Sequence, residues 1–303
     1  MSELLMETET LTDDAAQGTG LWRDAGRRLR RNRPAMVGLG VIVFFVVVAL
    51  AAPRIAVEPP SQPSDLGRLD GACCPGPSAE HWFGLDEQGR DLFSRIVYGS
   101  RTSLIIAIIS VVIGLSIGMV LGSLAGFLGG AVDVVIMRII DIMLAVPGLL
   151  FAIGLVALLG QGLIQLMLAV GIVSVPIFTR LLRGSILAVR EGDHVTAAWS
   201  LGLTPARVFL VHVLPNALSP IIVAATLAMA TAIVEVAGLG FLGLGNPDPR
   251  VPEWGAMLAN TPRFLASAPH LAFFPGVAIV LSVLGFNLLG DGLRESLDPR
   301  YRR

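Results

Sequence analysis

The side chains that could bind a metal, attack a substrate or hold a phosphate are few in this sequence, and they form no recognisable catalytic set. All 22 basic residues are arginine, so the chain has no lysine for the phosphates of a P-loop nucleotide or for a Schiff base. Cys73 and Cys74 are neighbours in a loop rich in proline and glycine. Because adjacent cysteines close a strained ring, we expect two unpaired thiols. The sequence therefore predicts no metal site and no enzyme, and any ATP that drives the protein must bind to another chain.

The composition is typical of a protein that crosses a membrane several times. Hydrophobic residues make up 54% of the chain and charged residues 15%, and the mean hydropathy is +0.74. The long uncharged runs, divided at glycine-rich or charged breaks, are long enough for transmembrane helices. We predict an all-α polytopic membrane protein, with Pro147 kinking the third helix. The six predicted transmembrane helices cover about residues 35–52, 103–124, 134–159, 163–182, 217–237 and 271–290.

The segments between the predicted helices indicate the topology. Residues 1–33 form a predicted N-terminal tail, disordered at its start, and residues 34–303 form one transmembrane domain with a long loop at 53–102. Six helices place both termini on one side, which carries 15 arginines against 7 on the other. Because arginine-rich segments stay in the cytoplasm, we assign both termini and residues 193–214 to the cytoplasm and loop 53–102 to the outside.

The interiors of the predicted helices are nearly uncharged, which disfavours a proton- or ion-coupled carrier. Glu235 lies near the outer end of the fifth helix, and we interpret it as an interfacial carboxylate, with a functional role as the alternative. Arg138 and Asp141, three residues apart, are able to pair on one helical face. Asn287 is better explained as a contact between helices than as a substrate ligand. Small residues in the second helix predict close helix packing: Gly114, Ser116, Gly118 and Gly122.

The polar segment between the fourth and fifth helices reads as two short helices joined by a turn, at about residues 193–214. Asp193 is a suitable N-cap for the first, and Gly202 stands where a left-handed residue ends a helix. Thr204 is a second N-cap, Pro205 suits the first helical position, and we expect Pro215 to stop the helix that follows. A structureless loop of this length is uncommon, so the pair has a function or lies as an amphipathic hairpin on lipid headgroups.

This segment resembles a known motif. The spacing of its alanines, glycine and leucine-proline pair is similar to the EAA loop in permease subunits of bacterial ABC importers, and its ending resembles the dipeptide/oligopeptide/nickel branch. The matching residues are Thr196, Ala197, Ala198, Gly202, His212, Leu214 and Pro215. Thr196 replaces the glutamate for which the motif is named, and His212 replaces an isoleucine common elsewhere in the family.

Three further segments resemble the same branch in the same order. Residues 83–101 are similar to the stretch before the family's second helix, residues 240–255 to the loop after its fifth, and residues 287–300 to its C-terminus. The match runs from about Pro34 to Arg300. It implies the six-helix, MetI-like fold of type I ABC importers and the "C" member of a pair of permeases.

The resemblance implies an ATP-driven transport subunit rather than an enzyme. It places the chain in the bacterial cytoplasmic membrane as a multi-pass protein surrounded by lipid, without a nucleic-acid partner, working by alternating access. The implied partners are a second homologous permease, two ATPase subunits that bind ATP and Mg, and an extracytoplasmic substrate-binding protein. No cofactor is expected in this chain. The implied cargo is a di- or oligopeptide, with nickel chelates or glutathione as alternatives.

In this family the two short helices dock into a groove on the ATPase subunit. The resemblance therefore assigns coupling to Ala197, Ala198, Gly202, Leu214 and Pro215. Two other classes stay open: a stand-alone secondary carrier or channel, and a membrane scaffold protein. Both predict that the chain purifies from its membrane without stoichiometric ATPase partners.

Overall fold

The computed structural model describes residues 21–63 and 73–297, and these ranges are mostly helical. The predicted all-α fold is confirmed, while residues 1–20 of the predicted tail lie outside the described residues. The long helices are α3 (Arg33–Ile55), α4 (Leu92–Leu128), α7 (Leu163–Arg190), α11 (Ser219–Phe241) and α13 (His270–Leu297). The shorter ones are α2 (Leu21–Arg31), α5 (Gly130–Leu144), α6 (Gly148–Leu159), α8 (Asp193–Ser200), α9 (Pro205–Val208), η2 (Phe209–Val213), α10 (Leu214–Ala217), α12 (Trp254–Leu258) and η3 (Thr261–Arg263).

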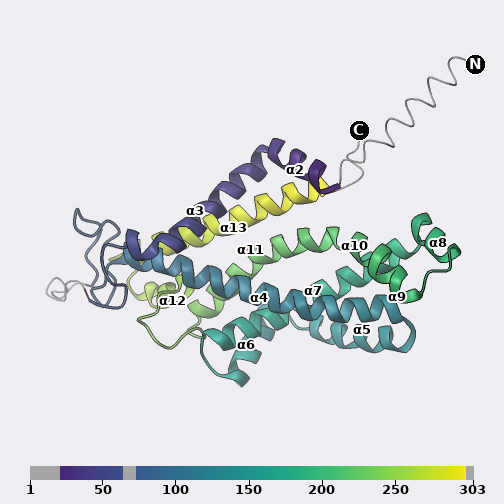
Figure 1. The fold of residues 1–303 in the computed structure, drawn as a ribbon. Helices are drawn as coiled ribbons and strands as arrows, with labels where there is room; N and C mark the ends of the chain where they lie inside the picture. The colour runs from purple at the N-terminus through teal and green to yellow at the C-terminus, as the bar shows by residue number, and fades with distance from the viewer. Residues whose placement is uncertain (1–20, 64–72, 298–303) are drawn as a thin grey trace, which may run out of the picture.

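Among the described residues, the five long helices are long and apolar enough to cross a membrane, and α5 with α6 makes a sixth crossing if the two count as one span. The two halves of that pair are bent by 93°. Pro147 is the N-cap of α6, and its ring and missing N–H prevent α5 from continuing. Figure 1 shows α6 leaving the line of α5. The third predicted helix is therefore two helices at a large angle rather than one kinked helix.

The second membrane helix is longer than the sequence pattern indicates. Asp91 caps α4 by accepting a hydrogen bond from the Ser94 N–H at 2.7 Å, so the helix begins at Leu92 rather than near residue 103. The predicted loop 53–102 is correspondingly shorter. Charged residues at 95 and 101 obscured this start because they fall inside the helix.

The most extensive contact between two helices is that of α4 with α7, and glycines make it possible. A methyl group added at Gly118 would lie 2.5 Å from Cβ of Phe178, and one added at Gly114 would lie 2.7 Å from the carbonyl oxygen of Gly171. Gly122 meets the backbone of Thr179 in the same way. Without a side chain the two backbones pack directly, which confirms the predicted contact for Gly114, Gly118 and Gly122. Ser116, the fourth residue of that prediction, is exposed and lies outside the contact.

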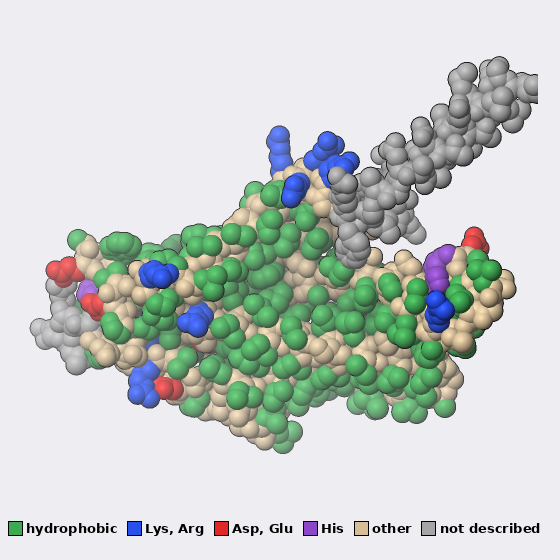
Figure 2. Space-filling view, viewed as in Figure 1, with side chains coloured by type: hydrophobic (Ala, Val, Ile, Leu, Met, Phe, Trp, Pro, Cys, Tyr) green, Lys and Arg blue, Asp and Glu red, His purple; other side chains and the backbone are tan. Residues whose placement is uncertain are grey.

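The bundle is elongated and has two different ends (Figure 1). One end, which we call the loop lobe, consists of residues 73–91 and 242–269 and contains α12. The other end carries α8 and α9, which we call the helix pair. Figure 2 shows hydrophobic side chains over the flank between them and charged side chains toward the ends. Exposed apolar residues such as Phe44, Leu50 and Ile142 fit contact with lipid or with other membrane helices.

Two ion pairs join α5 to α7. Asp141 pairs with Arg180 at 2.7 Å, and Oδ2 of Asp133 accepts a hydrogen bond from Arg183 at 2.6 Å. The predicted pairing of Asp141 with Arg138 is therefore wrong. The spacing of Arg138 and Asp141 suits a pair within one helix. Because α7 packs beside α5, Arg180 pairs with the Asp141 carboxylate instead.

Candidate functional site

The helix pair presents one face to the bundle and another outward. Val195 and Ala198 are buried against the core, whereas Ala197 is exposed. Trp199 is 47% exposed and Leu201 is 81% exposed. The sequence reasoning missed these two large apolar side chains. Trp199 and Leu201 lie outside the i, i+3 stripe of Val195 and Ala198, and this spacing could have identified them as outward-facing.

The turn between α8 and α9 has the predicted glycine geometry. Gly202 has a φ of +74°, and its N–H donates to the carbonyl oxygen of Trp199 at 2.9 Å. The Leu203 N–H donates to the carbonyl oxygen of Ala198 at 3.4 Å. These bonds close the C-terminus of α8, and only glycine takes this left-handed conformation at little cost. The turn therefore fixes the direction in which α9 leaves.

The caps of the helix pair differ from the prediction in one place. Asp193 is the first residue of α8, and Gly192 stands at the N-cap without a side-chain hydrogen bond. An acidic side chain in the first turn still interacts favourably with the helix dipole. Thr204 and Pro205 occupy the N-cap and first helical positions, as predicted. Thr196, which replaces the motif's glutamate, bonds weakly back to the carbonyl oxygen of Gly192 at 3.4 Å.

Pro215 does not end the helix, contrary to the prediction. The helix widens into the π-helix η2, where the Leu214 N–H donates to the carbonyl oxygen of Phe209, and α10 then continues through Pro215. The side chain of Asn216 donates to the carbonyl oxygen of His212 at 2.7 Å. The wider turn of a π-helix leaves space for the proline ring, which would clash with a backbone carbonyl in a regular α-helix. The helix pair is therefore joined to α11 by nearly continuous helix.

The five predicted coupling residues do not share one surface. Ala197, Gly202 and Pro215 are exposed, Leu214 is half-buried, and Ala198 is buried. The exposed members and the apolar tip formed by Trp199 and Leu201 are available to a partner. Ala198 and Leu214 instead belong to the packing that supports them.

The segment η2, which follows the helix pair, rests on the end of α4, and the end of α7 is hydrogen-bonded to the same place. The ring of Phe209 lies 4.5 Å, centroid to centroid, from that of Phe127 near the end of α4. Arg190, the last residue of α7, donates to the carbonyl oxygen of Gly126 at 2.9 Å. The segment that follows α9 and the end of α7 therefore both contact the end of α4.

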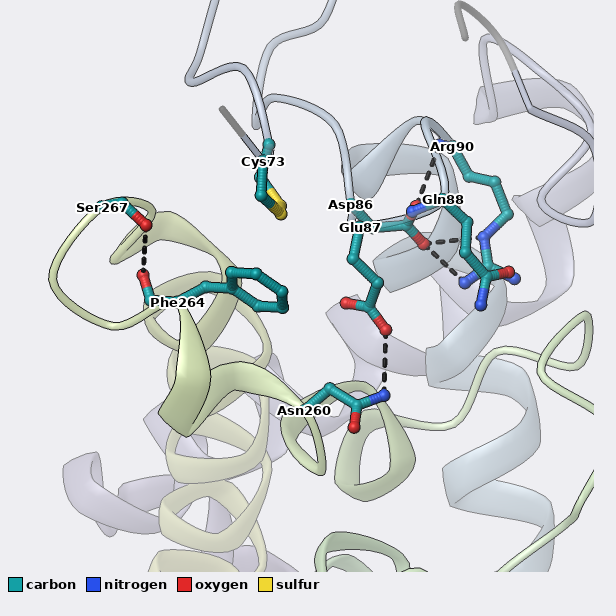
Figure 3. Close-up of a disulfide and its surroundings, with 9 residues drawn as sticks. Cys73, Asp86, Glu87, Gln88, Arg90, Asn260, Phe264 and Ser267 are labelled. Atoms are coloured by element: carbon teal, nitrogen blue, oxygen red, sulfur yellow. Dashed lines mark hydrogen bonds and ion pairs between the residues drawn. A yellow bond between two sulfur atoms is a disulfide. The ribbon is translucent and has the colours of Figure 1, made fainter. Parts of the chain in front are cut away.

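At the opposite end, a buried ion network organises the loop lobe. Oδ2 of Asp86 accepts from Nε of Arg90 at 2.7 Å and lies 3.2 Å from Nε of Arg95. Both arginines also donate to the carbonyl oxygen of Pro249, at 2.6 and 3.2 Å. Figure 3 shows Asp86 facing Arg90, with Glu87 turned toward Asn260. The network ties two segments that are far apart in the sequence, and a cavity of about 80 Å³ lies beside it.

A second buried acid, Glu253, caps α12. Its carboxylate accepts from the N–H groups of Gly255 and Ala256 at 2.7 and 2.8 Å. Burial raises the pKa of the Glu253 carboxyl, and these N–H donors act in the opposite direction. The next residue, Trp254, is fully buried and donates from Nε1 to the carbonyl oxygen of Ile96 in α4 at 3.1 Å. These contacts explain Trp254 as a packing residue. Gly240 and Gly255 are packing residues too, because a methyl group added at either would meet Glu253 or the backbone of Ala237.

Cys73 and Cys74 form a disulfide with each other, so the expectation of unpaired thiols is wrong. Cys74 has a φ of +72°, a left-handed conformation that turns the backbone between the two side chains. Cys74 is buried with Leu92 and Leu271. Figure 3 shows Cys73 beside the ring of Phe264. The disulfide belongs to the apolar packing of the loop lobe.

Two family models match the chain. Residues 118–303 match the binding-protein-dependent transport system inner membrane component, and residues 20–69 match the N-terminal TM domain of oligopeptide transport permease C. The first range contains the helix pair and the second contains α3.

Curated relatives are similar over nearly the whole chain. The dipeptide transport system permease protein DppC of Alkalihalophilus pseudofirmus is 46% identical over 290 residues, which cover 96% of this chain and 93% of the relative. The glutathione transport system permease protein GsiD of Shigella flexneri is 45% identical over 281 residues, which cover 93% of this chain and 91% of the relative. The GsiD protein of an Escherichia coli strain is 43% identical over the same length.

Solved structures share the fold. The inward-facing MetNI methionine ABC transporter has a chain that aligns with a TM-score of 0.56 at 19% identity, covering 67% of this chain and 96% of that one. An amino acid ABC transporter crystallised with histidines aligns with a TM-score of 0.52 at 20% identity, covering 67% of this chain and 94% of that one. These alignments confirm the predicted MetI-like fold. On these matches, the chain belongs to the binding-protein-dependent transport system inner membrane components, the permease subunits of ABC importers.

Proposed function

We propose that this permease imports di- or oligopeptides, pairing with a second homologous permease and drawing energy from two ATPase subunits that bind ATP and Mg. An extracytoplasmic binding protein delivers the cargo to the loop lobe. The identity to a dipeptide permease over almost the full chain supports a peptide cargo. Glutathione, the cargo in the names of other relatives, is itself a small peptide and is the second candidate.

The observation that carries this proposal is the apolar tip of the helix pair. Trp199 and Leu201 are exposed at the end of the bundle, on helices whose other face is anchored through Val195 and Ala198. A rigid element with an exposed apolar surface fits a protein partner that covers it. The ATPase subunit is the partner that the family supplies. Coupling through Ala197, Gly202, Leu214 and Pro215 is part of the proposal.

The proposed orientation places the helix pair in the cytoplasm and the loop lobe outside. Arginines 27, 28, 30 and 31 lie in α2, and Arg33 is the first residue of α3. Helix α2 packs on α13, whose last turns run toward the helix-pair end (Figure 1). A cytoplasmic assignment of this end follows the positive-inside rule. Both termini are then cytoplasmic.

The test is a substitution in the turn. In Gly202→Val, a β-branched residue would have to adopt a φ of +74°, which costs about 1–3 kcal/mol and favours another turn geometry. We expect the four-subunit complex to assemble and hydrolyse ATP, but stimulation by loaded binding protein and peptide uptake into proteoliposomes should be lost. Gly184→Ala is the matched control, since a methyl group there meets no atom within 4 Å. Normal uptake by Gly202→Val would contradict the proposed role of the turn.

Removing the apolar tip tests docking itself. The double substitution Trp199→Ala and Leu201→Ala removes two exposed side chains and leaves the buried residues Val195 and Ala198 in place. We expect the two permeases to stay together while the ATPase subunits dissociate during affinity purification. Stoichiometric recovery of the ATPase subunits would show that this tip is not the docking surface.

A further inference from the structure

Glu235 is a carboxylate within a membrane-spanning helix. It lies on α11 six residues before the last residue, Phe241, which places it about 9 Å inside the helix end at about 1.5 Å per residue. Within residues 21–63 and 73–297, no hydrogen bond or ion pair engages its side chain. A carboxylate at this depth is costly unless it faces water or a polar partner. Its position therefore requires an explanation beyond helix packing.

On the face of α11 that carries Glu235, the residues four before it and three after it are a threonine and a glycine. Thr231, one turn earlier on the same face, is exposed, and its hydroxyl contacts only the carbonyl oxygen of Leu227, at 3.5 Å. Gly238 follows three residues later and lies against the side chain of Leu149. From Thr231 to Leu239 this face exposes no large apolar side chain, since Leu239 is buried, whereas Val234 beside it is 52% exposed. The face of Thr231 and Glu235 is therefore poorly suited to lipid.

The break between α5 and α6 lies beside this face. A methyl group added at Gly148, the first residue of α6, would lie 3.5 Å from Oε1 of Glu235. The three residues of the break, 145–147, are all exposed. Irregular backbone at membrane depth is tolerated where it is buried in protein or lines a water-filled cavity. The break between α5 and α6 and the Glu235 carboxylate therefore lie next to each other.

We propose that this face of α11 lines the transport pathway and that the Glu235 carboxylate binds the N-terminal ammonium group of the peptide cargo. A single carboxylate suits one ammonium group, with which it forms a charge-assisted hydrogen bond. It does not suit a bare metal ion, because no cluster of three or more acidic, histidine or cysteine side chains occurs in the described part of the chain. This inference rests on the proposed function, since it supposes a peptide cargo.

Uptake into proteoliposomes tests the role of the charge. The full complex with its ATPase subunits and binding protein is compared as wild type, Glu235→Gln, Glu235→Asp and the control Asp291→Asn, an exposed acid near the far end of α13. Losing a charge-assisted hydrogen bond to the cargo should lower peptide uptake by Glu235→Gln roughly 10- to 100-fold. Glu235→Asp should keep part of the activity and Asp291→Asn all of it. ATP hydrolysis stimulated by loaded binding protein should persist in every variant, which shows that folding and coupling are intact.

Thiol labelling tests the exposure to water. Both native cysteines are paired with each other, so Glu235→Cys introduces the one free thiol of this chain. In the complex it should react with a charged, water-soluble methanethiosulfonate, and saturating peptide with binding protein should slow the reaction. Phe44→Cys, on a 59% exposed apolar position of α3, is the lipid-facing control and should react slowly.

The outcomes separate the inference from the function on which it rests. Wild-type uptake by Glu235→Gln, or no labelling of Glu235→Cys, would overturn the inference while peptide import stands. Poor recovery of the Glu235→Gln complex together with an unreactive Glu235→Cys would assign the carboxylate to an ion pair with the second permease instead. Failure of the wild-type complex to import any peptide would refute the proposed function itself.

Discussion

The ion network of the loop lobe gives the sharpest stability prediction. The perturbation is Asp86→Asn, which removes the charge that faces Arg90 and Arg95. The side chains of Arg90 and Asp86 are only 4% and 7% exposed, so water cannot replace the lost carboxylate without rearranging the lobe. The two guanidinium groups would keep only neutral oxygen acceptors: the amide oxygen of the new side chain and the carbonyl oxygens of Pro249 and Pro60.

The magnitude follows from this burial. Removing one partner of a buried ion pair typically costs about 3–5 kcal/mol, because the remaining charge is desolvated and uncompensated. Two arginines share Asp86, at 2.7 and 3.2 Å, so both lose their counter-charge in one substitution. We therefore expect Asp86→Asn to lower the free energy of unfolding by about 3–5 kcal/mol. Adding Arg90→Gln to Asp86→Asn should recover part of the loss, with a coupling energy of about 1–3 kcal/mol.

The assay is unfolding of the purified permease in mixed micelles by titration with a denaturing detergent, followed by tryptophan fluorescence. Trp254 is fully buried within the loop lobe and reports its opening. The control is Arg250→Ala, because the Arg250 and Asp248 pair is exposed and should contribute nothing measurable. If Asp86→Asn unfolds with the same midpoint as Arg250→Ala, the network does not hold the lobe together and the reasoning is refuted.

Two further predictions concern helix packing and pH. Gly118→Ala should destabilise the permease by about 1–3 kcal/mol in the same titration, since the added methyl group would meet Phe178, whereas Gly154→Ala, which meets nothing within 4 Å, should not. Equal midpoints for these two variants would contradict the close contact of α4 and α7. Burial raises the pKa of Glu253 in the folded state, so stability should fall as pH rises from the ordinary carboxyl value of 4.5 through the raised value. Glu253→Gln should abolish that slope when unfolding is measured from acidic to alkaline pH, and an unchanged slope would assign it to another group.

The parts of the fold that the sequence predicted are those governed by local physics. Apolar runs located the membrane helices because only helices satisfy their own backbone in lipid. Gly202 and Pro205 located the turn and the second helix start because their backbone preferences act without help from the rest of the protein. The motifs around these residues also led to the permease family.

The failed predictions depended on helix packing or on backbone geometry that the residue pattern does not reveal. Asp141 pairs with Arg180 rather than Arg138 because α7 packs beside α5. The helix continues through Pro215 because the wider π-helical turn η2 directly precedes it. Cys73 and Cys74 pair because the backbone at Cys74 turns to a positive φ within a packed lobe. None of these choices has a signature in the local residue pattern.

The candidate site divides in the same way. The sequence identified the segment of the helix pair but could not tell its buried residue, Ala198, from its exposed ones, because that depends on which face the bundle covers. The sequence identified Glu235 as a carboxylate near the end of a membrane helix but did not indicate which residues surround it.

The sequence by itself determined that this protein is an all-helical membrane protein with a short helix pair between two membrane helices, because hydrophobic length, glycine turns and proline starts are local constraints; the resemblance of its motifs added the permease family. The tertiary structure alone decided that Trp199 and Leu201 form the outward tip and that Asp86 joins two arginines. It alone placed the α5–α6 break beside Glu235. The reason is physical: burial and charge pairing are properties of the surroundings, which form only when distant segments pack together.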